Sequence, residues 1–152
     1  MKLPLTGSCQ CGAIRYQSTA APLTVYGCHC TSCQTQSGSA FGTSMLVPRD
    51  GVSFTHGTPT LWLRTAENGR KVLAHFCGTC GTRLVHFPEH SPTRAIIRPG
   101  TLDDTSQLYL VGHIWTRSKQ PWFKIPPDAV TYEQQPPDFA KLIEAYASRQ
   151  LG

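Results

Sequence analysis

The sequence has no long hydrophobic run. No stretch of its 152 residues reaches the roughly 18 consecutive apolar residues that a membrane-spanning helix needs. The first residues, Met1 to Gly7, also lack the apolar segment of a signal peptide. We therefore expect a cytoplasmic protein that does not enter a membrane and whose thiols are reduced.

Charge is sparse as well. Charged residues make up 15% of the chain, and no run of Lys or Arg is long enough to form a basic stripe. The formal charge of +5 counts every cysteine as a neutral thiol. Seven thiolates holding two Zn²⁺ would lower it to about +2. We expect no nucleic-acid partner.

Internal repeats and low-complexity segments are also lacking, so the length predicts one domain over residues 1–152.

Cysteine, in contrast, is plentiful and clustered. Cys28, Cys30 and Cys33 fall within six residues, and the other four form the pairs Cys9/Cys11 and Cys77/Cys80. A structural zinc takes four protein ligands, whereas a catalytic zinc takes three and keeps one position open. One four-thiolate site and one three-thiolate site would account for all seven cysteines. Spacing alone does not decide which outer pair shares a metal with which cluster.

Other interpretations of the cysteines stay open at this point. A disulfide framework fits poorly with an odd count and a reducing compartment. A redox role for Cys77/Cys80 would need a thioredoxin-like βαβ setting, against which a preceding hairpin argues. Cys9 and Cys11 could simply be buried at a strand start. A histidine, His29 or His75, could complete the middle cluster as a structural Cys3His site.

The order of short apolar segments and turn signals predicts a mainly β fold. The Asn68-Gly69 pair is a strong hairpin signal between two strands. Gly12 is placed to bend the chain so that Cys9 and Cys11 reach one metal, and Gly81 is expected at positive φ in the Cys77–Cys80 knuckle. Strands are expected at 14–16, 23–26, 43–47, 61–64, 71–76, 83–87, 95–97 and 108–115.

Two segments stand apart from this strand pattern. Residues 34–42 are rich in small and polar side chains, which predicts a loop that can present backbone N–H groups to an anion. The C-terminus predicts the one helix, at about 138–150. Asp138 can cap it, and apolar residues recur at helical spacing from Phe139 to Tyr146.

Three motifs together resemble the glutathione-dependent formaldehyde-activating enzyme family, which also includes centromere protein V. They are Gly7–Tyr16, Cys28–Cys33 with the following Ser37-Gly38, and Phe76–Thr82, and the similarity continues from His113 to Trp122. The resemblance implies a single-domain, zinc-stapled β-tent. It further implies a structural zinc on Cys9, Cys11, Cys77 and Cys80 and a catalytic zinc on Cys28, Cys30 and Cys33.

The resemblance also implies a reaction, the addition of glutathione to formaldehyde to give S-(hydroxymethyl)glutathione, or the reverse carbon–sulfur cleavage. Another small thiol or aldehyde would suit the same zinc site. Two Zn²⁺ are expected per chain, the second being the one that can be lost, and a homodimer is one expected assembly. The alternative is a non-enzymatic, zinc-stabilised interaction module. From residue type and position, we expect substrate contacts from His29, Ser37, Gly38, Trp115, Arg117, Lys119 and Trp122.

Overall fold

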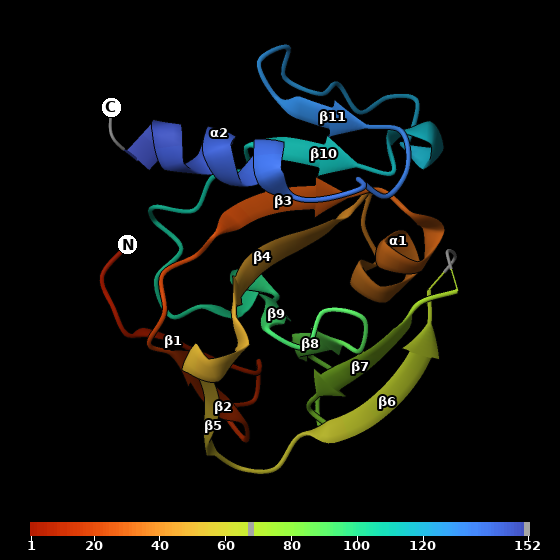
Figure 1. Cartoon of the computed structure of the whole chain (residues 1–152). Helices are drawn as coiled ribbons and strands as arrows, with labels where there is room; N and C mark the ends of the chain where they lie inside the picture. Colours follow the sequence, from red (N-terminus) through yellow and green to blue (C-terminus); the bar gives the residue numbers. More distant parts are fainter. Residues whose placement is uncertain (67–68, 151–152) are drawn as a thin grey trace. The chain divides into compact units, whose positions relative to one another are not determined.

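The structure is a computed structural model that describes residues 1–66 and 69–150 (Figure 1). The chain divides into two compact units, which are described separately below. Unit 1 comprises Met1–Pro22 and Met45–Leu108, and unit 2 comprises Leu23–Ser44 and Tyr109–Gly152. The cysteine pairs Cys9/Cys11 and Cys77/Cys80 belong to unit 1, whereas Cys28, Cys30 and Cys33 belong to unit 2.

Unit 1 contains a three-stranded antiparallel sheet in the order β1-β2-β5. Its strands are β1 (Leu5–Ser8), β2 (Arg15–Ser18) and β5 (Val52–His56). Side chains alternate between the faces of β2, so that Tyr16 and Ser18 are buried while Arg15 and Gln17 are partly exposed. The 3-10 helix η1 (Arg49–Gly51) leads directly into β5.

The other strands of unit 1 are also antiparallel, in the order β4-β9-β8-β7-β6. They are β4 (Gly42–Pro48), which belongs to unit 1 from Met45 on, β6 (Thr60–Thr65), β7 (Lys71–Phe76), β8 (Arg83–Pro88) and β9 (Arg94–Ile97); η2 (Pro99–Thr101) follows β9. The expected hairpin is present as the pairing of β6 with β7. Asn68 of its turn lies outside the described residues, and Gly69 has φ +78°.

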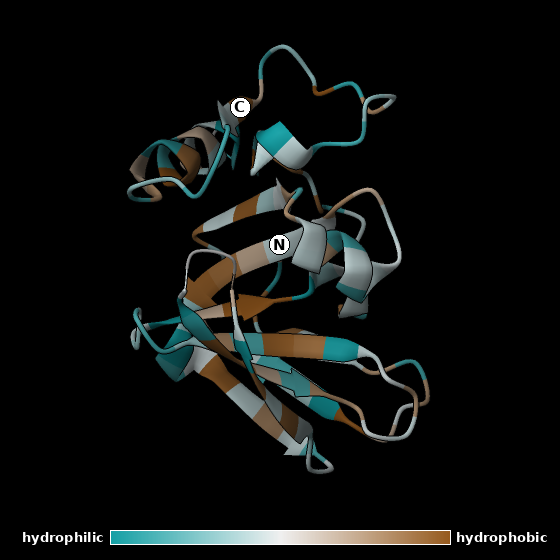
Figure 2. Ribbon diagram, turned by 90° about the vertical axis from the view of Figure 1, so that its right-hand side faces the viewer, coloured by the Kyte–Doolittle hydropathy of each residue, from teal (hydrophilic) through white to brown (hydrophobic). Residues whose placement is uncertain are grey.

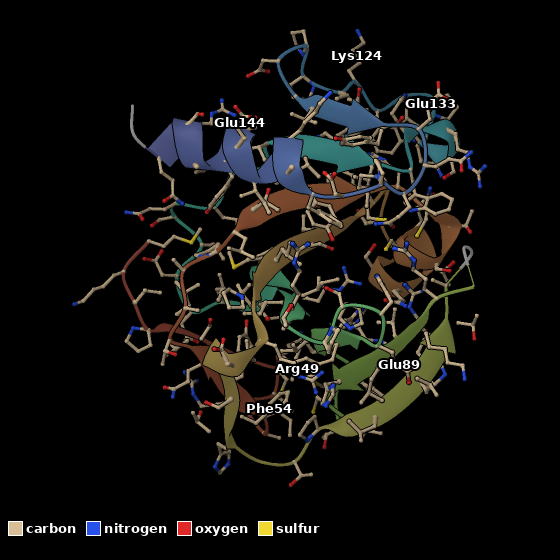
Figure 3. The ribbon with its side chains drawn as sticks, viewed as in Figure 1. Arg49, Phe54, Glu89, Lys124, Glu133 and Glu144 are labelled. Carbon is tan, nitrogen blue, oxygen red and sulfur yellow. The ribbon has the colours of Figure 1, made fainter. Side chains whose placement is uncertain are left out.

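Hydrophobic and hydrophilic residues alternate along the strands of unit 1 (Figure 2). The buried set forms its core, with Met45, Leu84 and Ile97 all fully buried. Phe54 of β5, labelled in Figure 3, stacks on the His75 ring of β7 with 5.4 Å between centroids. This ring pair connects the two groups of strands within unit 1.

Unit 2 is built on three parallel strands in the order β11-β10-β3, namely β3 (Thr24–Cys28), β10 (Gly112–Ile114) and β11 (Val130–Tyr132). Its helices are α1 (Thr31–Ser37), the 3-10 helix η3 (Thr116–Ser118) and α2 (Ala140–Gln150). Helix α2 runs beside β3 (Figure 1), where Thr24 Oγ1 donates to the Leu142 carbonyl at 2.9 Å. Leu142 and Tyr146 are the buried residues of α2.

The mainly β fold class predicted from the sequence is confirmed. The predicted C-terminal helix is present, with the Asp138 carboxylate accepting the Ala140 N–H at 2.9 Å. The prediction of a loop over residues 34–42 is wrong for residues 34–37, because α1 extends to Ser37. Of the strand expected at 108–115 only β10 forms, and Trp115, with φ +58°, follows its C-terminal end. Strands β1, β5 and β11 were not expected, and Cys9 and Cys11 lie between β1 and β2 rather than at the start of a strand.

The single domain predicted from the sequence stays a prediction. Among the helices of the described residues, none has the length and apolar character needed to cross a membrane.

Candidate metal centres

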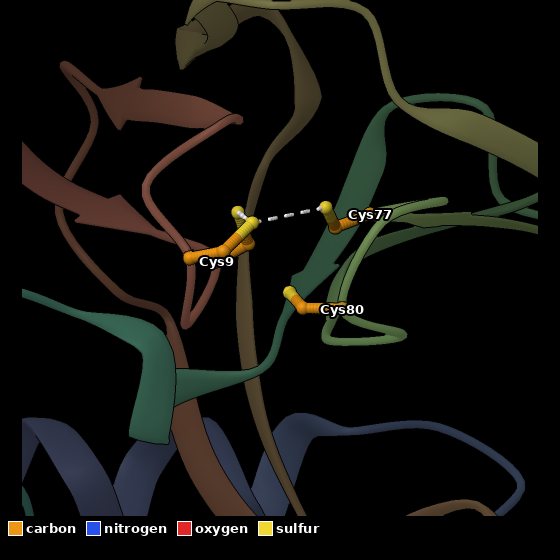
Figure 4. A group of neighbouring side chains, drawn as sticks. Cys9, Cys77 and Cys80 are labelled. Atoms are coloured by element: carbon orange, nitrogen blue, oxygen red, sulfur yellow. Dashed lines mark hydrogen bonds between the residues drawn. The ribbon is translucent and has the colours of Figure 1, made fainter.

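The first cysteine cluster of unit 1 begins in the connection between β1 and β2. Cys9 N–H donates to the Ile14 carbonyl at 3.0 Å, which closes a loop around Cys11. Gly12 has φ +77°, a left-handed conformation that glycine adopts without a Cβ penalty. The bend expected at Gly12 is therefore present, and the Sγ atoms of Cys9 and Cys11 lie 3.6 Å apart. Figure 4 shows the Cys9 side chain on the same side as those of Cys77 and Cys80.

The second half of this cluster is the knuckle between β7 and β8. Cys77 follows β7 and donates its N–H to the Thr82 carbonyl at 2.9 Å, while Gly81 N–H donates to the Cys77 carbonyl at 2.8 Å. Gly81 has φ +75°, as predicted. The knuckle joins two antiparallel strands, so the βαβ setting that a thioredoxin-like redox pair requires is not the setting of Cys77 and Cys80.

The four sulfurs of this cluster have the spacing of a zinc site. Cys11 Sγ lies 3.6 Å from Cys9 Sγ and 3.7 Å from Cys77 Sγ, and all four Sγ atoms, including that of Cys80, lie within 4.8 Å of one another. A tetrahedron with Zn–S bonds of about 2.3 Å has S···S edges of about 3.8 Å, whereas a disulfide would bring two sulfurs to about 2.05 Å. All seven cysteines of the chain are free thiols, which contradicts a disulfide framework.

Hydrogen bonds to Cys9 and Cys80 favour the charged form of these two thiols, whereas the thiols of Cys9 and Cys80 raise the pKa of Cys11 to about 11. Ile14 N–H donates to Cys9 Sγ at 3.2 Å, and Thr82 Oγ1 lies 3.2 Å from Cys80 Sγ. The Thr82 side chain and backbone lower the pKa of the Cys80 thiol to about 5. Gln10 N–H donates to the same Thr82 hydroxyl oxygen at 3.2 Å, so the loop of Cys9 and Cys11 is also tied to the knuckle directly.

The cluster of unit 2 is local in sequence. Cys28 ends β3, Cys30 is the N-cap of α1, and Cys33 lies in its first turn. Cys33 N–H donates to Cys30 Sγ at 3.4 Å, and Cys28 Sγ lies 3.6 Å from Cys30 Sγ. Gly38, with φ +57°, ends the helix as a left-handed C-cap. These two caps explain why a polar segment without helical periodicity forms α1 after all.

The three thiols of unit 2 fit a zinc ion with one position left for another ligand. Their exposed fractions are only 5–7%, and their Sγ atoms lie within 4.8 Å of one another. Within the described part of the chain, this cluster consists of the three cysteines and includes no histidine or carboxylate. The nearby thiols of Cys30 and Cys33 raise the pKa of Cys28 above its usual value, and burial adds to the rise. A bound cation would offset this mutual repulsion of three thiolates.

His29, one of the two histidines considered as a fourth ligand, is fully buried and points into a ring cluster of unit 2. Its Nε2 lies 2.9 Å from His113 Nδ1, and its ring packs on Phe41 and Phe123 at 5.0 and 5.3 Å. Gly27 makes room for this arrangement, because a Cβ there would lie 2.7 Å from His113 Nδ1. His75, the other candidate, belongs to unit 1. His29 was also expected to contact substrate, and its burial argues for a supporting role.

A hydrogen-bond network that the sequence did not indicate connects this cluster to the loop after β10. Gln34 Nε2 donates to the carbonyls of His29 (2.7 Å) and Ser118 (2.8 Å), and Gln34 Oε1 accepts from Gln120 Nε2 at 2.7 Å. Both carbonyls can only accept, which fixes the orientation of the Gln34 amide. Ser118 Oγ adds a second donor to the His29 carbonyl at 3.0 Å.

Two expected substrate residues, Ser37 and Gly38, lie at the exposed end of α1. Ser37 Oγ donates to the Cys33 carbonyl at 2.8 Å, a local bond within the helix. Gly38 N–H donates to the Gln34 carbonyl as part of the C-cap. Both residues therefore have structural contacts of their own.

The other four expected substrate residues lie on the loop after β10. Trp115 is buried, with the Arg117 guanidinium 4.9 Å from its ring centre. Lys119 Nζ donates to the Phe123 carbonyl at 2.7 Å. Trp122 is 70% exposed, and Arg117 is exposed too. Arg117 and Trp122 are thus the two of these side chains that lie open to solvent.

Comparison with known proteins identifies a family and a similar fold. The family model described as glutathione-dependent formaldehyde-activating enzyme matches residues 4–118. A crystal structure of a Rhodobacter sphaeroides protein, a structural genomics target, is similar with a TM-score of 0.54 and 18% sequence identity. The match covers 69% of this chain and 96% of that chain. At this identity the likeness concerns the fold alone.

Proposed function

Because the chain belongs to the glutathione-dependent formaldehyde-activating enzyme family, we propose that it is a zinc-dependent carbon–sulfur lyase acting on the adduct of glutathione and formaldehyde. In the synthetic direction, the glutathione sulfur forms a bond to the aldehyde carbon, the thiol proton is lost and the aldehyde oxygen gains a proton. The product is S-(hydroxymethyl)glutathione, and cleavage is the reverse. No oxidant or reductant is needed.

The observation that carries this proposal is the three-cysteine cluster of unit 2, which lacks a fourth protein ligand among the described residues. We propose Cys28, Cys30 and Cys33 as the ligands of the catalytic zinc, and Cys9, Cys11, Cys77 and Cys80 as those of a structural zinc. A zinc ion on three thiolates offers one open position, favours a soft ligand there and lowers the pKa of a thiol that binds to it.

The protein's own contribution is to hold the three thiols and the neighbouring loop in fixed positions. Helix α1 keeps Cys30 and Cys33 together through the N-cap bond, and Gln34 fixes the loop that carries Arg117 and Trp122. The exposed Arg117 guanidinium suits a carboxylate of the thiol substrate, and Trp122 offers an apolar wall. We propose these two as the substrate contacts of this loop, with Lys119 and Trp115 supporting it.

The test is the variant Cys30→Ser. Serine is a good N-cap, so α1 should persist while a soft zinc ligand is lost. We expect turnover of glutathione and formaldehyde, followed by NMR exchange spectroscopy, to fall to the uncatalysed rate while the circular dichroism spectrum is unchanged. Ser32→Ala, a neighbouring change that removes no sulfur, should keep the wild-type rate.

Cobalt substitution gives a second measurement on the same site. The visible spectrum of the Co²⁺ protein should change when glutathione is added, and Cys30→Ser should abolish the change. A spectrum that no thiol perturbs would mean that the second ion is fully ligated by the protein. That result would favour the alternative, a zinc-stabilised interaction module without enzymatic activity.

A further inference from the structure

Unit 1 gathers four cationic or ionisable side chains on one face of its larger sheet. Trp62 pairs with Ala74 and Ala74 pairs with His86, so these three residues stand in one row across β6, β7 and β8. Arg64 lies two residues beyond Trp62 on β6 and therefore shares its face. The small side chain of Ala74 leaves space between the neighbouring long ones. The group consists of Arg64, Arg83, His86 and Arg98.

Arg83 is held between two aromatic rings. Its guanidinium carbon lies 4.8 Å from the Trp62 ring centre and 4.9 Å from that of Phe76. Rings of this kind stabilise the cation without using its N–H groups, which point outward in the guanidinium plane. The two rings therefore leave the N–H groups of Arg83 to an acceptor that lies in the guanidinium plane.

The tautomer of His86 follows from its neighbour. Arg98 Nη2 lies 3.3 Å from His86 Nδ1, and because arginine can only donate, Nδ1 must accept. In the neutral imidazole the proton then resides on Nε2. His86 is 2% exposed, and its Nε2 has no hydrogen-bond partner in the part of the chain that the structure describes.

Within residues 1–66 and 69–150, three buried donors of this group consequently lack an acceptor: His86 Nε2, Arg83 Nη1 and Arg64 Nε. Burial and the positive charges of Arg98 and Arg64 lower the pKa of Arg83. Among the described residues, the charges that act on Arg83 and His86 are all positive. Buried donors without acceptors are costly, and like charges in proximity add to the cost. One anionic acceptor would accept hydrogen bonds from these donors and also reduce the repulsion between the positive charges.

We propose that Arg64, Arg83 and His86 form a binding site for a carboxylate. A carboxylate offers about four lone-pair positions to the three free donors, and its planar pair of oxygens matches the fork of the Arg83 guanidinium. The carboxylate could come from a small free acid or from a thiol substrate that carries one, such as glutathione. Only the second source rests on the function proposed above.

The experiment is an acetate titration of the zinc-loaded protein at constant ionic strength, observed through the side-chain ¹H–¹⁵N signals of His86. We expect a saturable shift of the Nε2–H resonance. Arg83→Gln should weaken binding about tenfold or more, since it removes a charge-assisted hydrogen bond. Arg64→Gln, on the terminal strand β6, should do the same if Arg83→Gln does not fold. Arg15→Gln removes an equal charge from an exposed pair with Asp103 and should bind acetate as the wild type does.

Comparing probes identifies the source. If glutathione shifts the Nε2–H resonance of His86 at a lower concentration than acetate does, and glutathione diethyl ester does not shift it, the site binds a carboxylate of the substrate. If glutathione and acetate act at equal concentrations, the site binds a free acid. No saturable shift, or tighter binding of inorganic phosphate than of either carboxylate, overturns the proposal. Cys30→Ser should leave the acetate response intact, so failure of the lyase assay and failure of this site are separate results.

Discussion

The two cysteine clusters differ in how far apart in the sequence their ligands lie. In unit 1, Cys11 and Cys77 are brought together from positions 66 residues apart. In unit 2, the three thiols lie within six residues, on the end of β3 and the start of α1. A metal that joins distant segments restricts the unfolded chain far more than one bound by a local segment. The first cluster should therefore stabilise the fold, and the second should be nearly dispensable for it.

The clusters also differ in electrostatics and exposure. Cys11 is exposed, and Thr82 lowers the pKa of Cys80 to about 5, so one ligand of this site is charged at neutral pH without a metal, although the neighbouring thiols raise the pKa of Cys11 to about 11. In unit 2 all three thiols are buried, and mutual proximity raises the pKa of Cys28. A site in which protein hydrogen bonds do less to stabilise the thiolates depends more strongly on the cation itself.

The largest expected effect is that of Cys80→Ser compared with Cys30→Ser. Structural zinc sites contribute on the order of 10 kcal/mol, comparable to the whole stability of a domain. We expect Cys80→Ser to lose its cooperative thermal transition in circular dichroism, whereas Cys30→Ser keeps it. Metal analysis should find the zinc of unit 1 still bound in Cys30→Ser.

Equal unfolding by the two variants would remove the proposed division between a structural and a catalytic ion. If Cys80→Ser unfolds unit 1 while the circular dichroism of α2 persists, the single domain expected from the sequence is wrong as well. One cooperative loss of all structure would support it.

Gln34→Ala should have a smaller effect, confined to unit 2. It removes three hydrogen bonds and leaves the Ser118 carbonyl without its Gln34 donor, whereas the His29 carbonyl keeps Ser118 Oγ. We expect a loss of about 2 kcal/mol, or roughly 4–8 °C in Tm. If Gln34 positions the loop, KM for glutathione should rise more than kcat falls.

The control for Gln34 is Thr35→Ala, an exposed change on the same helix. It should keep both the wild-type Tm and the wild-type KM. A KM unchanged by Gln34→Ala would mean that the loop carrying Arg117 is not part of the substrate site, even if stability falls.

The sequence predicted those parts of the structure that depend on short-range sequence patterns. Gly12 and Gly81 lie beside cysteines where the chain must turn, and both have positive φ as expected. The β6–β7 hairpin follows from alternating strands around a turn pair. The division of seven cysteines into four and three follows from zinc chemistry, and the resemblance to the family assigned each cysteine to its group. Within each of these groups the sulfurs lie within 4.8 Å of one another.

What the sequence missed depends on register between distant strands or on weak caps. His29 meets His113 only because β3 and β10 are parallel with Gly27 opposite His113. Helix α1 has no apolar periodicity and is fixed by Cys30 and Gly38 at its ends. Arg64, Arg83 and His86 share one face of the sheet through cross-strand pairing that no single segment reveals.

The smallest expected effects are those of replacing the glycine with positive φ beside each cysteine cluster. Gly81→Ala and Gly38→Ala each place a Cβ in open space but at positive φ, so each should cost about 1 kcal/mol of unfolding free energy. Gly100→Ala, also in open space but without a positive φ, should be close to neutral. Because Gly81 shapes the knuckle of Cys77 and Cys80, Gly81→Ala should also release zinc faster to a chelator. Gly38 follows the last cysteine of α1 by five residues, so Gly38→Ala should not change the rate of zinc release. Faster release from both variants would mean that α1 as a whole, rather than its first turn, holds the three thiols in place.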